Sequence, residues 1–447
     1  MQGIAGLSIP FLVKTNRDAI AAGLGSRKKK SVILLWMTGG PSQIDTWDPK
    51  PDRPLVNRGP FGTIPTKLSG VRICEHLPKQ AAILDRFTII RSVNARFSNH
   101  EPNMVFQTAN LDAEPRTNPE AKSYPSIASI IAKEHGPNSP AMPPYVGFYR
   151  SPSHIAFGGA LGQQYDPMQG NLAAKLPIYD LVGNNTGKMS SADMFQLSKG
   201  LSHERILDRR RLLSDLDHFR REIDISGSML AADVFQQQAV DILLGKQARE
   251  AFDLSLEPEK NRERYGKHLW CQQALLARRL VEAGVAFVSI DLSYHTASGT
   301  WDNHGDNIPP YGGISKGLKP LLPLFDHLLT TLVLDLEERG RLDEVLIIAM
   351  GEFGRTPIMG TQGSTDGRDH WPEVMSMSLA GGGLKHGQVI GATHADGGTI
   401  KERPISPGDL AATIYRHFDV PWNGQYLDRR GRPRNFVDQG QPIAEFF

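Results

Sequence analysis

The sequence predicts an α/β fold in which helices cover both faces of a largely parallel sheet. Short apolar runs of strand length alternate along the chain with segments whose apolar residues recur at helical spacing. The 447 residues include 44 glycines and 31 prolines, which gather largely in the loops after the apolar runs. We expect these loops to carry the functional residues, because ligands of open α/β sheets bind beyond the carboxyl ends of the strands.

The strands are predicted from continuous apolar runs, which are typical of strands buried on both faces of a sheet. The first run, at residues 31–37, follows four basic residues and ends abruptly at a Gly-Gly-Pro turn. The other strand candidates are residues 87–91, 145–148, 285–290, 344–350 and 375–379.

Helices are predicted between these strands. Residues 124–135 and 317–339 have apolar residues at helical spacing, and Ser406 can cap a last helix that ends near residue 418. Residues 201–285 have the pattern of long charged helices, so we expect them to form a helical insertion or cap. The motifs of residues 31–447 follow one another in order and require one site, which indicates a single domain.

Composition excludes several classes of protein. The formal net charge is only +2, which gives no general attraction to nucleic acid or to an anionic membrane. Two cysteines, Cys74 and Cys271, cannot make a disulfide-rich scaffold. The longest core-like apolar run, residues 32–37, is far shorter than the ~20 residues that span a membrane.

The first 30 residues have a composition of their own. Residues 3–13 are small and apolar, and residues 21–25 are rich in alanine and glycine, as in the later part of an export signal. No basic region precedes them. We expect either an export signal without its first residues or a flexible segment that forms a short amphipathic helix.

Acidic and imidazole side chains follow several predicted strands. Asp45 follows the first strand and could ligate a cation or cap a turn. After residues 285–290 come two acid–histidine pairs, Asp291 with His295 and Asp302 with His304. Carboxylate and imidazole together suit zinc, manganese or iron, whereas oxygen ligands alone favour calcium or magnesium. The alternative interpretation is a solvated loop rich in turns.

Two later loops carry further candidates. Glu352 lies between glycines after residues 344–350, and Arg355 could hold an oxyanion, although the two could also form an ordinary ion pair. His370 could be a neutral imidazole ligand, with Asp369 supporting it from behind. Four loops with ligand-type residues at one sheet edge together predict a metal site.

These motifs resemble a known bacterial family. The stretches SVILLWMTGGPSQIDTWDPKP, VRICEHLPKQAAILDRFTIIRSV, WDNHGDN, GEFGRTP and GRDHWP are similar to the family called domain of unknown function 1501, over nearly the whole chain. That family belongs to the alkaline phosphatase-like, or sulfatase-like, superfamily. The resemblance implies a three-layer sandwich around a mostly parallel sheet, with one or two divalent ions, and hydrolysis or transfer of sulfate and phosphate esters.

The resemblance also implies roles for single residues. The implied metal ligands are Asp45, Asp302, His304, Glu352 and His370, and the ion is zinc, calcium or manganese. Asp291 and His295 remain the alternative pair, because the superfamily often separates such a pair by three residues. Arg355 would orient the ester oxyanion. Phe353 stands where the superfamily commonly has a histidine, which weakens one metal position.

The nucleophile is the main departure from the superfamily. The equivalent segment, residues 98–108, lacks the sulfatase cysteine and its Pro-Ser-Arg. Ser98 or His100 could attack, His100 could instead bind metal, or a water molecule activated by the metal could attack. A site that is no longer catalytic is the remaining alternative.

We therefore expect an exported metal-dependent hydrolase that acts on sulfate or phosphate esters of small molecules or polysaccharides. The alternative is a non-catalytic protein that binds a polysaccharide or another cell-surface partner. Residues 3–10, GIAGLSIP, resemble the middle of twin-arginine export signals in similar proteins. This resemblance implies a periplasmic or extracellular protein, or a cytoplasmic one if the N-terminus is complete.

Overall fold

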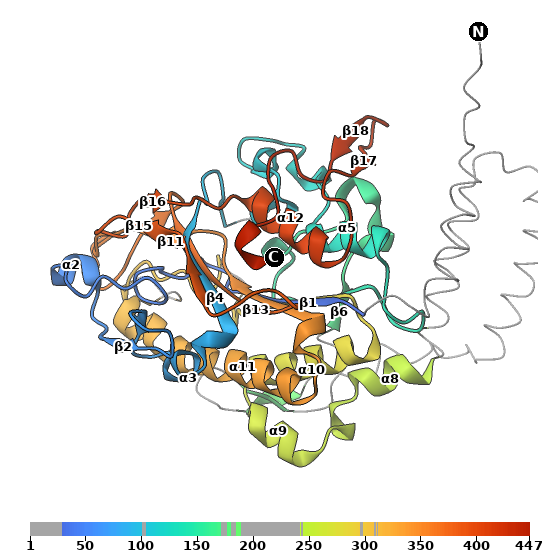
Figure 1. Ribbon diagram of the computed structural model, residues 1–447, viewed down its shortest axis with the longest axis horizontal. Coiled ribbons are helices and arrows are strands. Elements are labelled where there is room, and N and C mark those ends of the chain that lie inside the picture. The colour runs from blue at the N-terminus through green and yellow to red at the C-terminus, as the bar shows by residue number, and fades with distance from the viewer. Residues whose placement is uncertain are drawn as a thin grey trace, which may run out of the picture.

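A sheet of eight strands divides the protein into three layers (Figure 1). The computed structural model describes residues 29–100, 104–170, 177–179, 185–188, 242, 245–295, 298–307, 310 and 312–447. Along the sheet the strand order is β14-β4-β13-β10-β1-β9-β5-β6. The bounds are β1 Ser31–Trp36, β4 Phe87–Val93, β5 Tyr145–Phe148, β6 Met168–Gln169, β9 Phe287–Asp291, β10 Val345–Met350, β13 Met375–Gly381 and β14 Gln388–Ile390.

Strand direction gathers many chain segments at one edge of this sheet. β1 runs parallel to both of its neighbours, β9 and β10. β13 is antiparallel to β10 and to β4, so β4 again runs in the direction of β1. The carboxyl ends of β1, β4, β9 and β10 therefore share an edge with the start of β13.

The two faces of the sheet bury two separate apolar cores. On β1, Ile33 and Leu35 point into one core, while Val32 and Trp36 point into the other. Helices α3 (Pro78–Ala82), α10 (Leu269–Ala283) and α11 (Lys319–Glu338) cover the first face, and α5 (Ile127–Glu134) and α12 (Pro407–His417) cover the second (Figure 1). Each fully buried aliphatic side chain contributes roughly 1.5–3 kcal/mol through the hydrophobic effect.

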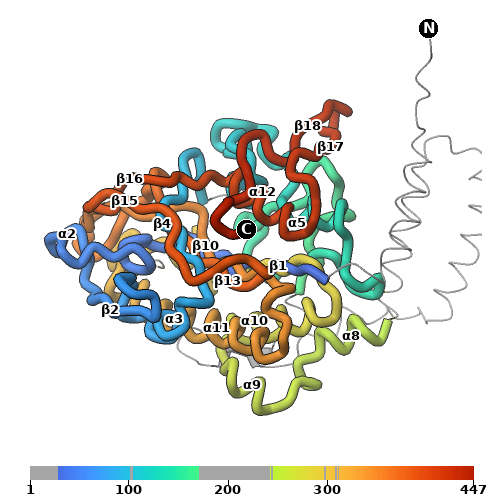
Figure 2. The backbone as a smooth tube through the Cα atoms, viewed as in Figure 1, coloured from blue at the N-terminus to red at the C-terminus, as the bar shows by residue number. Residues whose placement is uncertain are grey.

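Short elements surround the sandwich, and the tube in Figure 2 shows their path. The other α-helices in the described part of the chain are α2 (Leu55–Arg58), α4 (Met104–Thr108), α8 (Lys246–Phe252) and α9 (Glu259–Tyr265), with a π-helical turn at Ile314–Leu318 before α11. The two-stranded ribbons are β2 (Thr63–Pro65) with β3 (Arg72–Cys74), β7 (Pro177–Tyr179) with β8 (Asn185–Lys188), β11 (Gly354–Arg355) with β12 (His370–Trp371), β15 (Ala392–Thr393) with β16 (Ile400–Glu402), and β17 (Gln425–Leu427) with β18 (Pro433–Asn435).

The α/β class and all six predicted strands are confirmed, with shifts of one or two residues at several ends. Ser406 caps α12 in a reciprocal capping box with Asp409, as its position predicts.

Both cysteines are buried and free. Burial also raises the pKa of the Cys74 and Cys271 thiols to about 12.

The predicted insertion is described only in part. Residues 201–241 lie outside the described residues, as does most of the N-terminal segment 1–30. At the other end of the insertion, α10 packs under the sheet and supplies Trp270, Leu276 and Leu280 to the first core. That end is therefore an integral layer of the sandwich.

One helical segment among the described residues, Ile314–Glu338, is long and apolar enough to cross a membrane. Most of it is buried inside the protein, where α11 lies against α10 and α3 (Figure 1). Its apolar length is explained by its place in the first core.

A buried histidine makes the fold sensitive to acid. His417 lies at the end of α12, is 3% exposed, and its Nε2–H donates to the Ser31 carbonyl at 3.0 Å. Burial lowers the pKa of His417 to about 4, although the Ser31 bond opposes this. The unfolded chain therefore takes up this proton between pH 6.5 and 4 while the folded chain does not, so stability is lost as the pH falls through that range.

We predict that His417→Gln reduces this loss, because the amide can donate to Ser31 but does not titrate. The free energy of unfolding from urea titrations should fall between pH 7 and pH 4.5 by roughly 2–3 kcal/mol more in the wild type than in the variant. A difference between the two proteins that stays constant across this pH range would contradict the assignment.

Candidate metal centre

Two loops and one short ribbon bring four ligand-type side chains to the shared edge of the sheet. His100 follows β4, Asp302 and His304 follow β9, and His370 lies in β12, just before β13. His370 reaches this edge because β13 runs against its neighbours, so the start of β13 lies beside the ends of the other strands.

Close backbone packing sets the position of the Asp302 loop. Gly39, directly beyond β1, has φ 118°, and a Cβ there would lie 2.3 Å from the backbone nitrogen of Asp302. Only glycine tolerates both the conformation and the contact. The indole of Trp301 is fully buried and donates from Nε1 to the Leu292 carbonyl at 3.0 Å, which anchors the loop in the core.

The β11–β12 ribbon places His370 beside Arg355, because the two residues pair directly across it. The side chain of Gln43 fastens the ribbon to the loop after β1. It accepts from the Arg355 backbone N–H at 2.8 Å and donates to the Arg355 carbonyl at 2.9 Å.

The four side chains converge on one small volume. One ligand atom from each of His100, Asp302, His304 and His370 lies within 4.8 Å of the other three. The Nε2 of His370 is 2.6 Å from the Nε2 of His100 and 2.8 Å from that of His304. The Asp302 carboxylate is 3.0 Å from His304 Nε2 and 3.4 Å from both His100 Nε2 and His370 Nε2.

Carboxylates behind the histidines set their ring orientation. Glu352 is fully buried, and its Oε1 accepts from His100 Nδ1 at 2.7 Å and from the Gly39 backbone N–H at 2.8 Å. Asp369 Oδ1 lies 3.5 Å from His304 Nδ1. A carboxylate that accepts from Nδ1–H favours the tautomer in which Nε2 has a free lone pair. Histidines that bind metal ions through Nε2 commonly have such a carboxylate at Nδ1.

Electrostatics favour a cation at this point. Burial opposes the charge on Asp302, but Arg355 and the three histidines hold the pKa of Asp302 well below its usual range. Burial also opposes charge on His100, yet bonds with Asp302 and Glu352 raise the pKa of His100. Burial lowers the pKa of His370 to about 4, so its imidazole is neutral near neutral pH.

The residues present fit a divalent metal ion. The Nε2 of His370 lies at hydrogen-bond distance from the Nε2 of both His100 and His304, which would place lone pairs face to face, and a shared cation relieves that repulsion. Three nitrogens and one carboxylate form a donor set that suits zinc and other transition metals.

Phe353 forms an apolar wall beside this set. It is 1% exposed, and its ring centroid lies 4.7 Å from that of His100 and 4.8 Å from that of His370. The side chain of His370 is 33% exposed, whereas that of Asp302 is 2% exposed. The centre therefore meets solvent on the His370 side.

The structure brings together only part of the predicted ligand set. Asp302, His304 and His370 converge, and His100, which sequence reasoning left as a nucleophile or a ligand, joins them. Glu352 does not converge with them but lies one step behind, on His100. Asp45 is held elsewhere, since its Oδ2 accepts from Arg368 Nε at 2.7 Å and from Ser42 Oγ at 2.5 Å.

The guanidinium of Arg355 donates to groups of the protein itself. Its Nε donates to the Gly40 carbonyl at 2.8 Å, its Nη1 to the Arg368 carbonyl at 3.2 Å, and its Nη2 to Asp302 Oδ1 at 2.5 Å and to the Gly39 carbonyl. The side chain is fully buried. In this arrangement the guanidinium does not face outward, which argues against the predicted contact with an ester oxyanion. Its position beside Asp302 instead neutralises that carboxylate.

The alternative pair, Asp291 and His295, does not join the cluster, and Asp291 is bonded to His154 instead. Asp291 Oδ2 accepts from His154 Nδ1 at 2.8 Å, and its Oδ1 accepts from Thr38 Oγ1 at 2.6 Å. His295 is not among the converging atoms. Sequence reasoning missed His154, because its partner Asp291 lies 137 residues further along the chain.

Ser98 remains a candidate nucleophile. It is 8% exposed, and its Oγ has no hydrogen-bond partner among the residues that the structure describes. It lies two residues before His100, on the loop that follows β4.

The fold is similar in outline to several solved structures. The PsFucS1 sulfatase from Pseudoalteromonas sp. is 13% identical, with 91% of this chain and 70% of that chain covered and a TM-score of 0.38. The phosphonate monoester hydrolases from Silicibacter pomeroyi and Agrobacterium radiobacter are 11% and 12% identical. They cover 93% of this chain, and 76% and 77% of their own, with TM-scores of 0.38 and 0.32. Values this low carry no argument about activity.

Comparison with curated proteins gives no match. The family described as "Protein of unknown function (DUF1501)" matches residues 29–447, which include every segment of the metal centre. The chain belongs to this family, as its motifs predict.

Proposed function

We propose that the protein is a metal-dependent hydrolase of sulfate or phosphate esters. The observation that carries the proposal is the convergence of three imidazole nitrogens and the Asp302 carboxylate at the edge of the sheet where α/β proteins bind their ligands. The resemblance of the family to the alkaline phosphatase-like superfamily supports the ester as substrate.

The donor set favours zinc or manganese and disfavours calcium, which prefers six to eight oxygen ligands. His100, His304 and His370 would bind through Nε2, and Asp302 through its carboxylate. When bound, the ion supplies Lewis-acid chemistry that polarises an ester oxygen and stabilises developing negative charge.

The chain's own residues prepare the centre for this chemistry. Glu352 holds His100 in the tautomer whose Nε2 is free to bind. Arg355 neutralises Asp302 from the protein side, and Phe353 keeps water from the flank of His100 and His370. A substrate would approach past His370, the most exposed of the four ligands. Ser98 would supply the attacking oxygen, with water as the alternative nucleophile.

A second candidate function is a non-catalytic binding protein with a structural ion. The specific observation in its favour is that four protein donors already complete a tetrahedral zinc site, whereas catalytic zinc commonly has three. Turnover of any ester that depends on the added metal would exclude this candidate.

The substrate's alcohol or sugar part, and export by the twin-arginine route, remain proposals. The export segment lies almost entirely outside the described residues. The substrate class rests on the family resemblance alone.

We predict that Asp302→Ala and His370→Ala each abolish stoichiometric binding of zinc or manganese, because each removes one of four converging donors. Metal content after dialysis, measured by mass spectrometry, should be near one ion in the wild type and near zero in the variants. His394→Ala is the matched control, since His394 is exposed and lies outside the cluster. Equal metal content in all four proteins would contradict the site.

We predict that Glu352→Gln weakens metal affinity by about 10- to 100-fold without abolishing binding. The amide keeps an acceptor for His100 Nδ1 but loses the negative charge that favours a cation. Competition with a chromophoric chelator measures this change. An effect as large as that of Asp302→Ala would show that Glu352 is itself a ligand, against the geometry described above.

We predict that the metal-loaded protein hydrolyses 4-nitrophenyl sulfate or 4-nitrophenyl phosphate, and that Ser98→Ala lowers kcat at least about a thousandfold. Ser255→Ala, which changes an exposed serine between α8 and α9, should leave kcat unchanged. Full activity in Ser98→Ala would assign the attack to water, and no activity with any metal would overturn the hydrolase proposal.

A further inference from the structure

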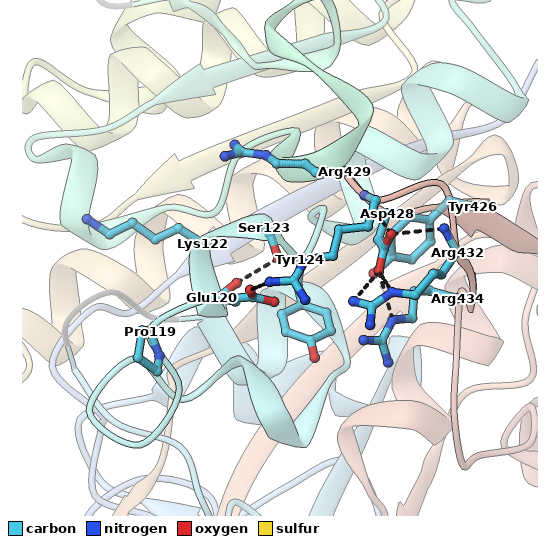
Figure 3. A pocket seen from close by; sticks show the side chains of 11 residues that line it. Pro119, Glu120, Lys122, Ser123, Tyr124, Tyr426, Asp428, Arg429, Arg432 and Arg434 are labelled. Atoms are coloured by element: carbon cyan, nitrogen blue, oxygen red, sulfur yellow. Dashed lines mark hydrogen bonds and ion pairs between the residues drawn. The ribbon is translucent and has the colours of Figure 1, made fainter.

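A polar pocket lies on the surface, lined by five residues of the segment 119–124 and by the β17–β18 hairpin (Figure 3). We name it the basic pocket, and its volume is about 280 Å³. The hairpin lies across the molecule from β11 in Figure 1, so the basic pocket is remote from the metal centre.

The turn of the hairpin is built to present arginines. Asp428 accepts from the backbone N–H of Arg430 at 2.8 Å and of Arg432 at 3.0 Å, and from Arg432 Nε at 2.8 Å. Gly431 completes the turn with φ 74°. Asp428 therefore fixes the backbone from which the neighbouring arginines project.

The pocket holds more positive charge than its own acids neutralise. Five cationic side chains and two carboxylates line it, an excess of three positive charges in a chain whose total formal charge is +2. Glu120 is paired with Arg430 at 2.7 Å, and Asp428 faces Arg432 and Arg434. Lys122 and Arg429 have no charged partner within the described part of the chain.

Two tyrosines complete the lining. Tyr426 is 5% exposed and Tyr124 is half-buried. Burial raises the pKa of both phenols, so their hydroxyls stay neutral and can donate to an anion. In Figure 3 the ring of Tyr124 lies between Glu120 and Arg434, where it offers a flat apolar surface beside the charged groups.

We propose that the basic pocket binds an anionic carbohydrate, a sugar that carries a sulfate, phosphate or carboxylate group. Its volume is near the ~300 Å³ at which pockets begin to hold small organic ligands, which is too large for a bare oxyanion. Guanidinium groups bind such oxyanions through paired hydrogen bonds, and an aromatic ring can pack against the C–H face of a sugar. The proposal does not rest on the function proposed for the metal centre.

The size of the charged area argues against a polynucleotide. Proteins that bind nucleic acid through its backbone typically neutralise about six to ten phosphates over an extended surface. Here the excess charge is confined to one pocket, two of whose arginines share the carboxylate of Asp428.

Isothermal titration with glucose 6-sulfate, glucose 6-phosphate, glucuronate, glucose and inorganic sulfate tests the proposal. We expect at least one of the anionic sugars to bind, and glucose and inorganic sulfate to bind at least tenfold more weakly. The variant Lys122→Ala/Arg429→Ala should weaken that binding at least tenfold, because it removes the two cations without a charged partner. Both residues are exposed, and circular dichroism checks that the variant keeps its fold.

The matched control is Arg249→Ala/Lys260→Ala, which also removes two exposed cations but from α8 and α9. Its affinity should stay within twofold of the wild type. The proposal is overturned if the wild type binds none of the sugars, if inorganic sulfate binds as tightly as the anionic sugars, or if the control loses as much affinity as the pocket variant. Binding of a single-stranded oligonucleotide in place of the sugars would assign the pocket to nucleic acid.

Discussion

The buried charge of Asp302 is the constraint around which the functional edge of the sheet is organised. A carboxylate this deeply buried is stable only when cations or hydrogen-bond donors surround it. Arg355 neutralises this charge from the protein side, and the three imidazoles lie against the carboxylate on its other side. Removing Arg355 would leave the charge uncompensated and would cost roughly 3–5 kcal/mol of stability.

The sheet makes this arrangement possible because its strand order places the relevant loops next to one another. β10, β1 and β9 are adjacent and parallel, so the loops that carry Arg355, Gly39 and Asp302 meet at one edge. The Asp302 loop can approach only because Gly39 has no side chain. The reversed strand β13 then delivers His370 to the same place from the other direction.

Much of this was predictable from sequence, and the reasons for the failures are physical. Strands were recognisable as continuous apolar runs, and Asp302, His304 and His370 lie in loops that had to follow or precede those runs. The role of Glu352 was not predictable, because a carboxylate that binds a metal ion and one that accepts from a ligand histidine have the same sequence pattern. Asp45 was predicted as a metal ligand but lies outside the cluster. It pairs with buried Arg368, which is too distant in the chain for the pairing to be recognised from sequence.

The central claim is that three histidines and one aspartate hold a divalent ion, and X-ray absorption at the metal edge tests it most directly. Protein loaded with zinc should show nitrogen and oxygen neighbours at about 2.0–2.1 Å, with the outer-shell scattering of three imidazoles. His370→Ala prepared in the same way should lose this zinc–imidazole signal, because the variant does not retain the ion. A first shell of oxygen alone, or an imidazole contribution unchanged in the variant, would contradict the account.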